Sequence, residues 1–280
     1  MPLSCNLDWS CAFQALFTQL FMNTIRYFPI AGILFFVIWV WKKDFFSPYR
    51  IQLKFPENDK LIYEIKQSFT TLVVFTFIGT TVFLLSKSGI AKTKIYRDFS
   101  EHSWTYVIST YIVLLIWHET FFYWVHRLMH SKRFYGLIHS VHHKSVNPSP
   151  LAAYNFHYLE AFLEAIYLPI FAYIVPIHYG VLIFHTFQAM LMNIYFHLGY
   201  EFYPKGFARN LIFKWINTTT HHNLHHSKFN GNYSLYFNFW DRIMGTNFKN
   251  YEEYYDKVIE RRESELKLRD SENKKDVIFA

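Results

Sequence analysis

Three clusters of histidine, with internal spacings of one, three or four residues, carry the clearest chemical potential in this chain. They are His126 with His130, His139 with His142 and His143, and His222 with His225 and His226. Residues three and four apart lie on one face of a helix, about 5–6 Å apart at Cβ, so each cluster can direct two or three imidazoles toward one point. Neutral imidazole is the commonest metal ligand in proteins. Because one tetrahedral zinc ion takes about four ligands, eight clustered histidines predict a centre for two metal ions.

The segments around the clusters are apolar. Of the 280 residues, 52% are hydrophobic and 21% aromatic. Residues 12–41, 68–85 and 104–125 approach or exceed the length of about 20 residues that crosses a bilayer, and residues 159–198 are long enough for a two-helix hairpin. We therefore expect an all-α fold, an integral membrane helical bundle of about four to five spans with a cytoplasmic, histidine-lined cap for two metals. A removable signal peptide is not expected, since its charged, apolar and cleavage regions do not occur in order.

The distribution of cationic residues predicts the orientation. No Lys or Arg precedes Arg26, whereas residues 42–66 contain six, so the positive-inside rule places that loop in the cytoplasm. Following the spans from there brings all three clusters to the cytoplasmic face. This topology places the loop 86–103 on the outer side, although it contains four cationic residues. The alternative is that the first two apolar segments form a shallow or re-entrant pair. We expect the endoplasmic reticulum as the location in a eukaryote and the inner membrane in a bacterium. The net charge of +7 comes without a nucleic-acid-binding motif, so no nucleic acid partner is expected.

Composition divides the chain into N-terminal membrane spans (1–103), a catalytic region (104–250) and a charged C-terminal tail (251–280). The third span should continue through His130, and the second cluster should lie on a short helix that ends at the prolines of 147–150. Thr218, Thr219 and Thr220 are expected to cap a helix carrying the third cluster. The tail should be helical in its middle and disordered at its end. Cys5 and Cys11 could pair or remain thiols.

Residues 119–248 resemble the fatty acid hydroxylase / sterol desaturase superfamily of membrane di-iron oxygenases, and together the shared motifs are highly specific. The residues before Glu119 show no specific match. The motifs are His126-Arg127-Leu128-Met129-His130, His139-Ser140-Val141-His142-His143, His222-Asn223-Leu224-His225-His226, Gly231-Asn232-Tyr233, Trp240-Asp241-Arg242 and Gly245-Thr246.

The resemblance implies that the eight clustered histidines bind two iron ions. It adds His197 and His157 as ligands, although Tyr158 replaces the proline that sterol-acting members have after the second of these. Glu119 and Asp241 are the expected catalytic-region carboxylates, which would orient the N–H groups of ligands. The remaining histidines are assigned as follows: His221 beside the ligands, His118, His178 and His185 in the core, and His102 at the surface.

The implied activity is the O2-dependent hydroxylation or desaturation of an unactivated C–H position in a sterol-like or long-chain membrane lipid. Electrons would come from an external protein of reductase, cytochrome b5 or ferredoxin type, since the sequence contains no such segment. Imidazole also suits zinc, copper and nickel, so the choice of iron depends on the resemblance. Two alternatives stay open: a metal-binding membrane scaffold without catalysis, and a zinc-dependent lipid hydrolase on the same ligands.

Overall fold

The computed structural model describes residues 6–279, except for the side chains of Asn273 and residues 275–279. Cys5, and with it the question of whether the two cysteines pair or remain thiols, lies outside the described residues. Three stretches have the length and hydropathy needed to cross a membrane. They are α1 (Trp9–Phe35) with its π-helical continuation Phe36–Trp41, α3 (Asn58–Ser88) and α4 (Trp104–Met129).

The predicted hairpin over 159–198 is present, but its helices are short. Its outgoing leg is α5 (Tyr158–Ala165) followed by α6 (Tyr167–Ile174), and its returning leg is α7 (Tyr179–Phe196). Pro176 lies in the turn between the legs, where the restricted backbone of an X-Pro pair ends a helix. Whether this hairpin crosses the bilayer decides the number of spans, so four to five spans stay a prediction.

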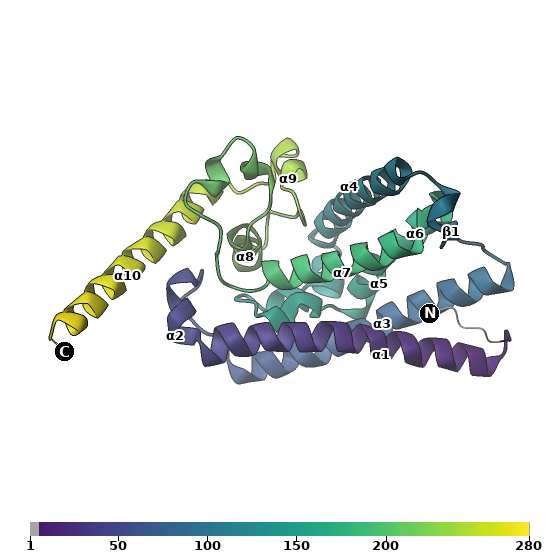
Figure 1. The fold of residues 1–280 in the computed structure, drawn as a ribbon, viewed down its shortest axis with the longest axis horizontal. Helices are drawn as coiled ribbons and strands as arrows, with labels where there is room; N and C mark the ends of the chain where they lie inside the picture. The colour runs from purple at the N-terminus through teal and green to yellow at the C-terminus, as the bar shows by residue number, and fades with distance from the viewer. Residues whose placement is uncertain (1–5, 280) are drawn as a thin grey trace.

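The fold is mostly helical rather than purely α. β1 (Ile95–Tyr96) pairs in parallel with β2 (Ile177–His178), which joins the loop after α3 to the tip of the hairpin. Two extended loops that meet in this way satisfy each other's backbone hydrogen bonds. The β pair lies at one end of the molecule. The histidine clusters lie away from it, where α4 and α7 terminate near α8 (Thr219–Lys228) (Figure 1).

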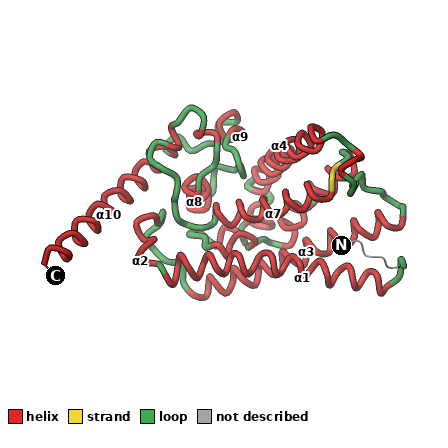
Figure 2. The backbone as a smooth tube through the Cα atoms, viewed as in Figure 1, coloured by secondary structure: helices red, strands yellow, loops and turns green. Residues whose placement is uncertain are grey.

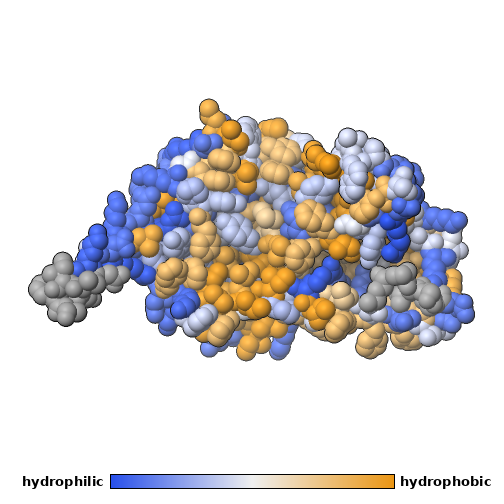
Figure 3. All heavy atoms as spheres, in the orientation of Figure 1, coloured by the Kyte–Doolittle hydropathy of each residue, from blue (hydrophilic) through white to orange (hydrophobic). Residues whose placement is uncertain are grey.

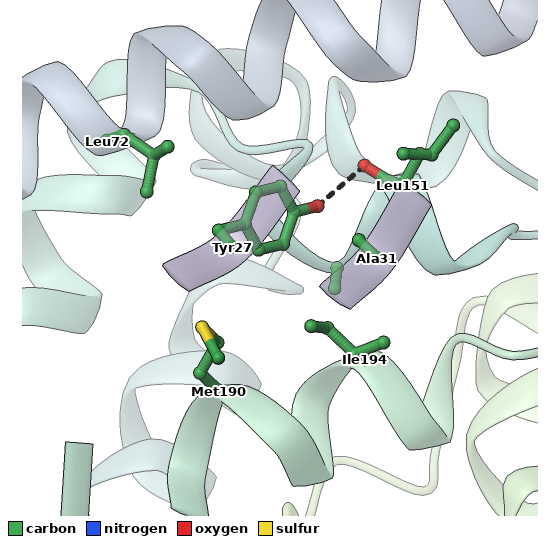
Figure 4. Close-up of a cluster of buried hydrophobic side chains, with 7 residues drawn as sticks. Tyr27, Ala31, Leu72, Leu151, Met190 and Ile194 are labelled. Carbon is green, nitrogen blue, oxygen red and sulfur yellow. Dashed lines mark hydrogen bonds between the residues drawn. The ribbon is translucent and has the colours of Figure 1, made fainter. Parts of the chain in front are cut away.

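A core cluster holds α1 and α3 against the middle of the chain. Tyr27 is fully buried, and its hydroxyl donates a 2.8 Å hydrogen bond to the carbonyl of Leu151 (Figure 4). Met190 and Ile194 of α7 belong to the same cluster. These contacts fix the 3-10 segment Pro150–Tyr154, which leads from the second histidine cluster to α5.

The outer surface of the long helices is apolar. Large hydrophobic side chains such as Phe17 of α1, Phe77 of α3 and Ile112 of α4 are exposed. Hydrophobic residues gather over the middle of the molecule, and hydrophilic ones gather on α10 and at the end that carries β1 (Figure 3). An apolar belt between polar ends is the pattern expected of a protein surrounded by lipid.

The short elements near the clusters are mostly turns and loops (Figure 2). The second cluster lies on a π-turn, Tyr135–His139, and a 3-10 turn, His142–Lys144, instead of the single short helix expected. Thr218 caps α8 (Thr219–Lys228) through its side chain, as predicted. The remaining helices are α2 (Lys43–Phe46), α9 (Phe239–Ile243) and α10 (Tyr251–Phe279).

The end of the charged tail is helical, which corrects the expectation of disorder. α10 continues to Phe279, and the run after Tyr251 contains no Gly or Pro and is rich in Glu, Lys and Arg, which favour helices. The helix is also tied down, because Arg269 donates hydrogen bonds to the carbonyl of Asp44 and to Ser47 Oγ.

The arrangement predicts which loops share a side of the membrane. Reporter domains fused after Lys43 and after Lys144 should report the same side, because both positions lie at the end where the clusters assemble. A reporter inserted at Ser88 should report the other side, because that loop is joined to the hairpin tip. Accessibility labelling of the three fusions in intact vesicles measures this, and opposite results for Lys43 and Lys144 would contradict the fold.

Candidate metal centre

The histidines converge in two groups whose candidate ligand atoms lie within 4.8 Å of one another. The first group is His126, His130, His139, His143 and His225. The second group is His142, His197, His222 and His226. All eight clustered histidines and His197 are therefore brought together, and His157 is not.

The first group draws on α4, the two turns and α8. The Nε2 atoms of His126 and His139 are 3.0 Å apart, and Nε2 of His143 lies 3.1 Å from those of His130 and His139. The buried Nε2 of His225 has no hydrogen-bond partner, and its ring lies 4.5 Å from that of His126 between centroids. Metal–nitrogen bonds of about 2.0–2.1 Å place two ligands at right angles about 3 Å apart, so these separations fit a shared ion.

The second group has the same spacing. Nε2 of His197 lies 3.0 Å from that of His222, 3.2 Å from that of His226 and 3.3 Å from that of His142. His222 and His226 are one turn apart on α8, with their Nε2 atoms 3.1 Å apart. His197 directly follows the last residue of α7. The end of the hairpin therefore adds a fourth imidazole to the one from the 3-10 turn and the two from α8.

The other ring nitrogen of several ligands is held by an acceptor, and this fixes the tautomer. His126 Nδ1 donates to the carbonyl of Tyr233, His225 Nδ1 to that of Gly231 and His197 Nδ1 to that of Asn193, at 2.7–2.8 Å. A neutral imidazole that donates from Nδ1 has only a lone pair at Nε2. The Nε2 lone pairs of these three rings therefore point toward the other imidazoles of their groups, where a cation would satisfy them. The residues fit a metal in each group.

Burial keeps these imidazoles neutral, as metal ligation requires. It lowers the pKa of His197 and of His225 to about 4. Burial together with the neighbouring imidazoles holds the pKa of His142, His222 and His226 well below its usual range. Near neutral pH the second group is therefore unprotonated and open to a metal.

Two carboxylates predicted at the centre act on the backbone beside it. Glu119 accepts hydrogen bonds from the backbone N–H groups of Leu235, Tyr236 and Phe237. Asp241 accepts those of Tyr233 and Ser234 and the hydroxyl of Thr246. Both are fully buried, and together they hold the segment whose carbonyls orient His126 and His225.

The carboxylate that contacts a candidate ligand directly is Glu160, to which the sequence analysis assigned no role. Its Oε1 accepts from His139 Nδ1 at 2.7 Å, and both side chains are almost fully buried. A carboxylate in this position fixes the ring and raises its basicity. Glu160 follows His157 by three residues, which places Glu160 in the first turn of α5. This spacing was the feature of the sequence that could have indicated its role.

The ligand assignment of His157 does not fit this geometry. Its side chain caps α5 by accepting a hydrogen bond from the backbone N–H of Leu159, and the residue is partly exposed. A cap must sit at the helix end with its ring turned toward the first N–H groups, so the ring is not directed at the metals.

The second metal group is also supported from a membrane helix. Glu64 of α3 is fully buried and accepts hydrogen bonds from the hydroxyls of Ser145, at 2.8 Å, and Ser149, at 2.5 Å. Asn155 donates to Ser145 Oγ, and its own carbonyl accepts from His142 Nδ1. Glu64 precedes the region that resembles the superfamily, so motif-based interpretation of the sequence gave it no role.

The other histidines form part of the packing. His118 stacks on Tyr167 at 3.7 Å between centroids, and His185 Nε2 lies 3.1 Å from the hydroxyl of the same tyrosine. His178 is buried and caps α7, and His102 stacks on Tyr106. His221 is fully buried with its Nε2 3.8 Å from Asp241, beside the ligands of α8 as expected.

A narrow cavity of about 10 Å³ lies between the two groups. Ligands of both groups line it, together with two phenylalanines and three polar residues from the hairpin. The lining residues are Phe122, His126, His139, His142, Phe156, Glu160, Glu164, Asn193, His197 and His222. The space is about large enough for one water molecule, lies next to both metal groups and is walled by α4, α5 and α7.

Comparisons with known proteins agree with the motifs. The family model described as fatty acid hydroxylase matches residues 111–246. The chain belongs to the fatty acid hydroxylase / sterol desaturase superfamily. No solved structure matches it.

Several curated relatives are named for oxidation of sterols. A Delta(7)-sterol 5(6)-desaturase of Gibberella zeae is 27% identical over 189 residues, which are 68% of this chain and 56% of the relative. Lathosterol oxidase of Rattus norvegicus is 32% identical over 59% of this chain and 54% of the relative, and that of Homo sapiens is 31% identical over 67% and 60%. The chain thus spans a little over half the length of these superfamily members.

The two groups predict different consequences of removing two histidines. His225→Ala should lower the metal bound by the purified protein from about two ions per chain toward one, because Nε2 of this residue points into the first group. His157→Ala is the matched control and should keep both ions, because this ring caps a helix. Elemental analysis of protein reconstituted anaerobically measures both. Loss of an ion in the control would restore His157 as a ligand.

Proposed function

We propose that this superfamily member is an O2-dependent di-iron oxidase that hydroxylates or desaturates an unactivated C–H position in a membrane lipid. The observation that carries the proposal is the pair of buried imidazole groups facing a common cavity inside an apolar helical bundle. One metal group alone would also fit a structural site, whereas two groups that share a cavity favour chemistry between them.

The first group would hold one iron and the second group the other. When bound, the two irons supply the redox chemistry that activates O2 against a C–H bond. Two electrons, two protons and one O2 are consumed per lipid, and the products are a hydroxylated lipid and one water or a new double bond and two waters. Imidazole ligation supports iron but does not select it, so the choice of iron draws on membership of the superfamily.

The side chains of the chain itself position the metals and the substrate. Glu160 and the backbone carbonyls of the 231–237 segment hold the ligand rings, and Glu119 and Asp241 hold that segment, so we assign these two carboxylates positioning roles. Phe122 and Phe156 line the cavity and would exclude water from the reacting carbon. Dry, preorganised surroundings strengthen every polar interaction inside the site.

We propose a sterol-like or other long-chain lipid as substrate. Its support is the apolar exterior next to the cavity and the names of the relatives, which are sterol desaturases and lathosterol oxidases. The active site would face the cytoplasm, in the endoplasmic reticulum of a eukaryote or the inner membrane of a bacterium, as the charge distribution favours.

Lipid analysis tests the reaction. Cells that express the protein should contain a lipid heavier by one oxygen or lighter by two hydrogens, and this product should be absent for His142→Ala, which removes a ligand of the second group. Comparative mass spectrometry of lipid extracts measures it. Cleavage of a lipid into two fragments without O2 or reductant would favour the zinc hydrolase. Metal binding with no lipid change on addition of a reductase system would favour the scaffold.

We propose that the electron donor is an acidic redox protein that docks beside the first group. The ligand His130 is partly exposed and lines an open hollow with Lys132, Tyr135 and Phe229. The carboxylates between residues 126 and 250 are Glu160, Glu164, Glu201 and Asp241, all of them buried. The exposed charged side chains of this region are therefore basic, and complementary charge speeds association.

Charge reversal tests this docking. Lys132→Glu should slow electron delivery from an acidic ferredoxin or cytochrome b5 several-fold at low ionic strength, and added salt should reduce the difference. Lys92→Glu, an exposed change at the opposite end, is the control. Stopped-flow reduction of the metal centre measures the rate. Equal rates for the two variants would place the donor elsewhere.

A further inference from the structure

We infer that Glu164 is a binding residue for a hydroxyl group of the lipid substrate, positioned in the cavity between the two metal groups. The inference rests on the proposed function, and it adds a recognition element that neither the motifs nor the relatives assign. Glu164 lies on α5 one helical turn after Glu160, so both carboxyl groups project from the same face of that helix.

The side chain of Glu164 is buried without a partner. Only 9% of the residue is exposed, and it lines the cavity. Within residues 6–279 its carboxyl group forms no hydrogen bond and no ion pair. Its neighbour Glu160, by contrast, uses one oxygen to hold His139. Of the two carboxyl groups in the cavity, Glu164 is therefore the one left entirely for a ligand.

An unpaired buried carboxyl group is costly. Burying a polar group without a hydrogen bond is unfavourable, and a buried ionisable residue in a cavity is a functional candidate for that reason. A packing role would be served better by an apolar side chain of the same size. A ligand that brings a hydroxyl group into the cavity removes the penalty.

The rest of the cavity narrows the ligand chemistry. Asn193 is held in place because its Nδ2 donates to the carbonyl of Ala153 at 2.7 Å. Its amide oxygen stays available to accept from a ligand. Phe122 and Phe156 provide apolar walls. The polar groups that remain are the carboxyl group of Glu164, Oε2 of Glu160 and the amide oxygen of Asn193, and the rest of the lining is apolar or imidazole. These oxygens can accept from a hydroxyl group, whereas they would repel an anionic headgroup.

The placement has a consequence for the reaction. Because Glu164 and ligands of both metal groups line one cavity, the oxidised carbon must lie only a few bonds from the hydroxyl group. One hydrogen bond to a charged group changes an affinity by a factor of about 10–10², so the site should reject an analogue that lacks the hydroxyl group. Glu164 would therefore determine both the substrate and the position of attack.

Equilibrium binding to the purified, metal-loaded protein in lipid nanodiscs tests the inference without turnover. The probes are lathosterol against its 3-deoxy analogue, and 1-octadecanol against octadecane, so that a rigid and a straight-chain hydroxyl lipid are separated. In one of the two pairs the hydroxyl probe should bind tighter by a factor of about 10–10². Glu164→Leu should abolish that preference by weakening the hydroxyl probe alone, and Glu164→Gln, which still offers a polar partner, should keep part of it.

Phe162→Leu, on the exposed side of α5, is the matched control and should keep the full preference. Metal content reports whether each variant is folded, and Glu164→Met replaces the leucine variant if that one loses its ions. No preference in the wild type, or a preference unchanged in the apolar variant, overturns the inference. Either result can occur while the wild type still binds two ions and oxidises a lipid, so failure here is distinct from failure of the proposed function.

Discussion

The constraint on which the rest of the structure depends is the convergence of nine imidazoles, all buried except the half-buried His130, with ring nitrogens directed at one another. Without cations these nitrogens repel and have lost their contacts with water. The chain holds several of these rings in place through hydrogen bonds from Nδ1, the ring nitrogen on the other side, to backbone carbonyls and to Glu160. The same burial that would destabilise an empty core makes the site selective for metal, because protonation is suppressed and the ligand geometry is set in advance.

Hydrogen bonds join the long apolar helices directly to the segment that supports the metal centre. Tyr27 of α1 and Glu64 of α3 both bond to the segment 145–155, which carries the acceptor for His142. The part of the chain before residue 111, which the family model leaves unmatched, therefore contributes to the geometry of the second group. A centre at the edge of an apolar bundle needs such ties, since turns and 3-10 segments have few backbone hydrogen bonds of their own.

The buried carboxylates of this molecule have different roles, and each role depends on the group that the carboxylate contacts. Glu119 and Asp241 face backbone N–H groups and hold a loop, Glu160 faces a ligand, and Glu164 faces the cavity. Spacing along the sequence does not separate these roles. The partners lie 116–118 residues away for Glu119, 21 for Glu160 and 5–8 for Asp241, and Glu164 faces an empty space.

The sequence by itself determined the apolar helices, the helical cap at Thr218 and the histidines that converge, because these follow from local periodicity, capping chemistry and motif spacing. Only the tertiary structure decided how the histidines are shared. The second and third clusters are each divided between the two metal groups: His142 faces away from His139 and His143, and His225 faces away from His222 and His226. Neighbouring residues of a turn or helix point in different directions, so a cluster contiguous in sequence serves two ions once α4 and α7 are packed beside it. The same packing left His157 at a helix end and brought Glu64 from a distant membrane helix into the support of the site.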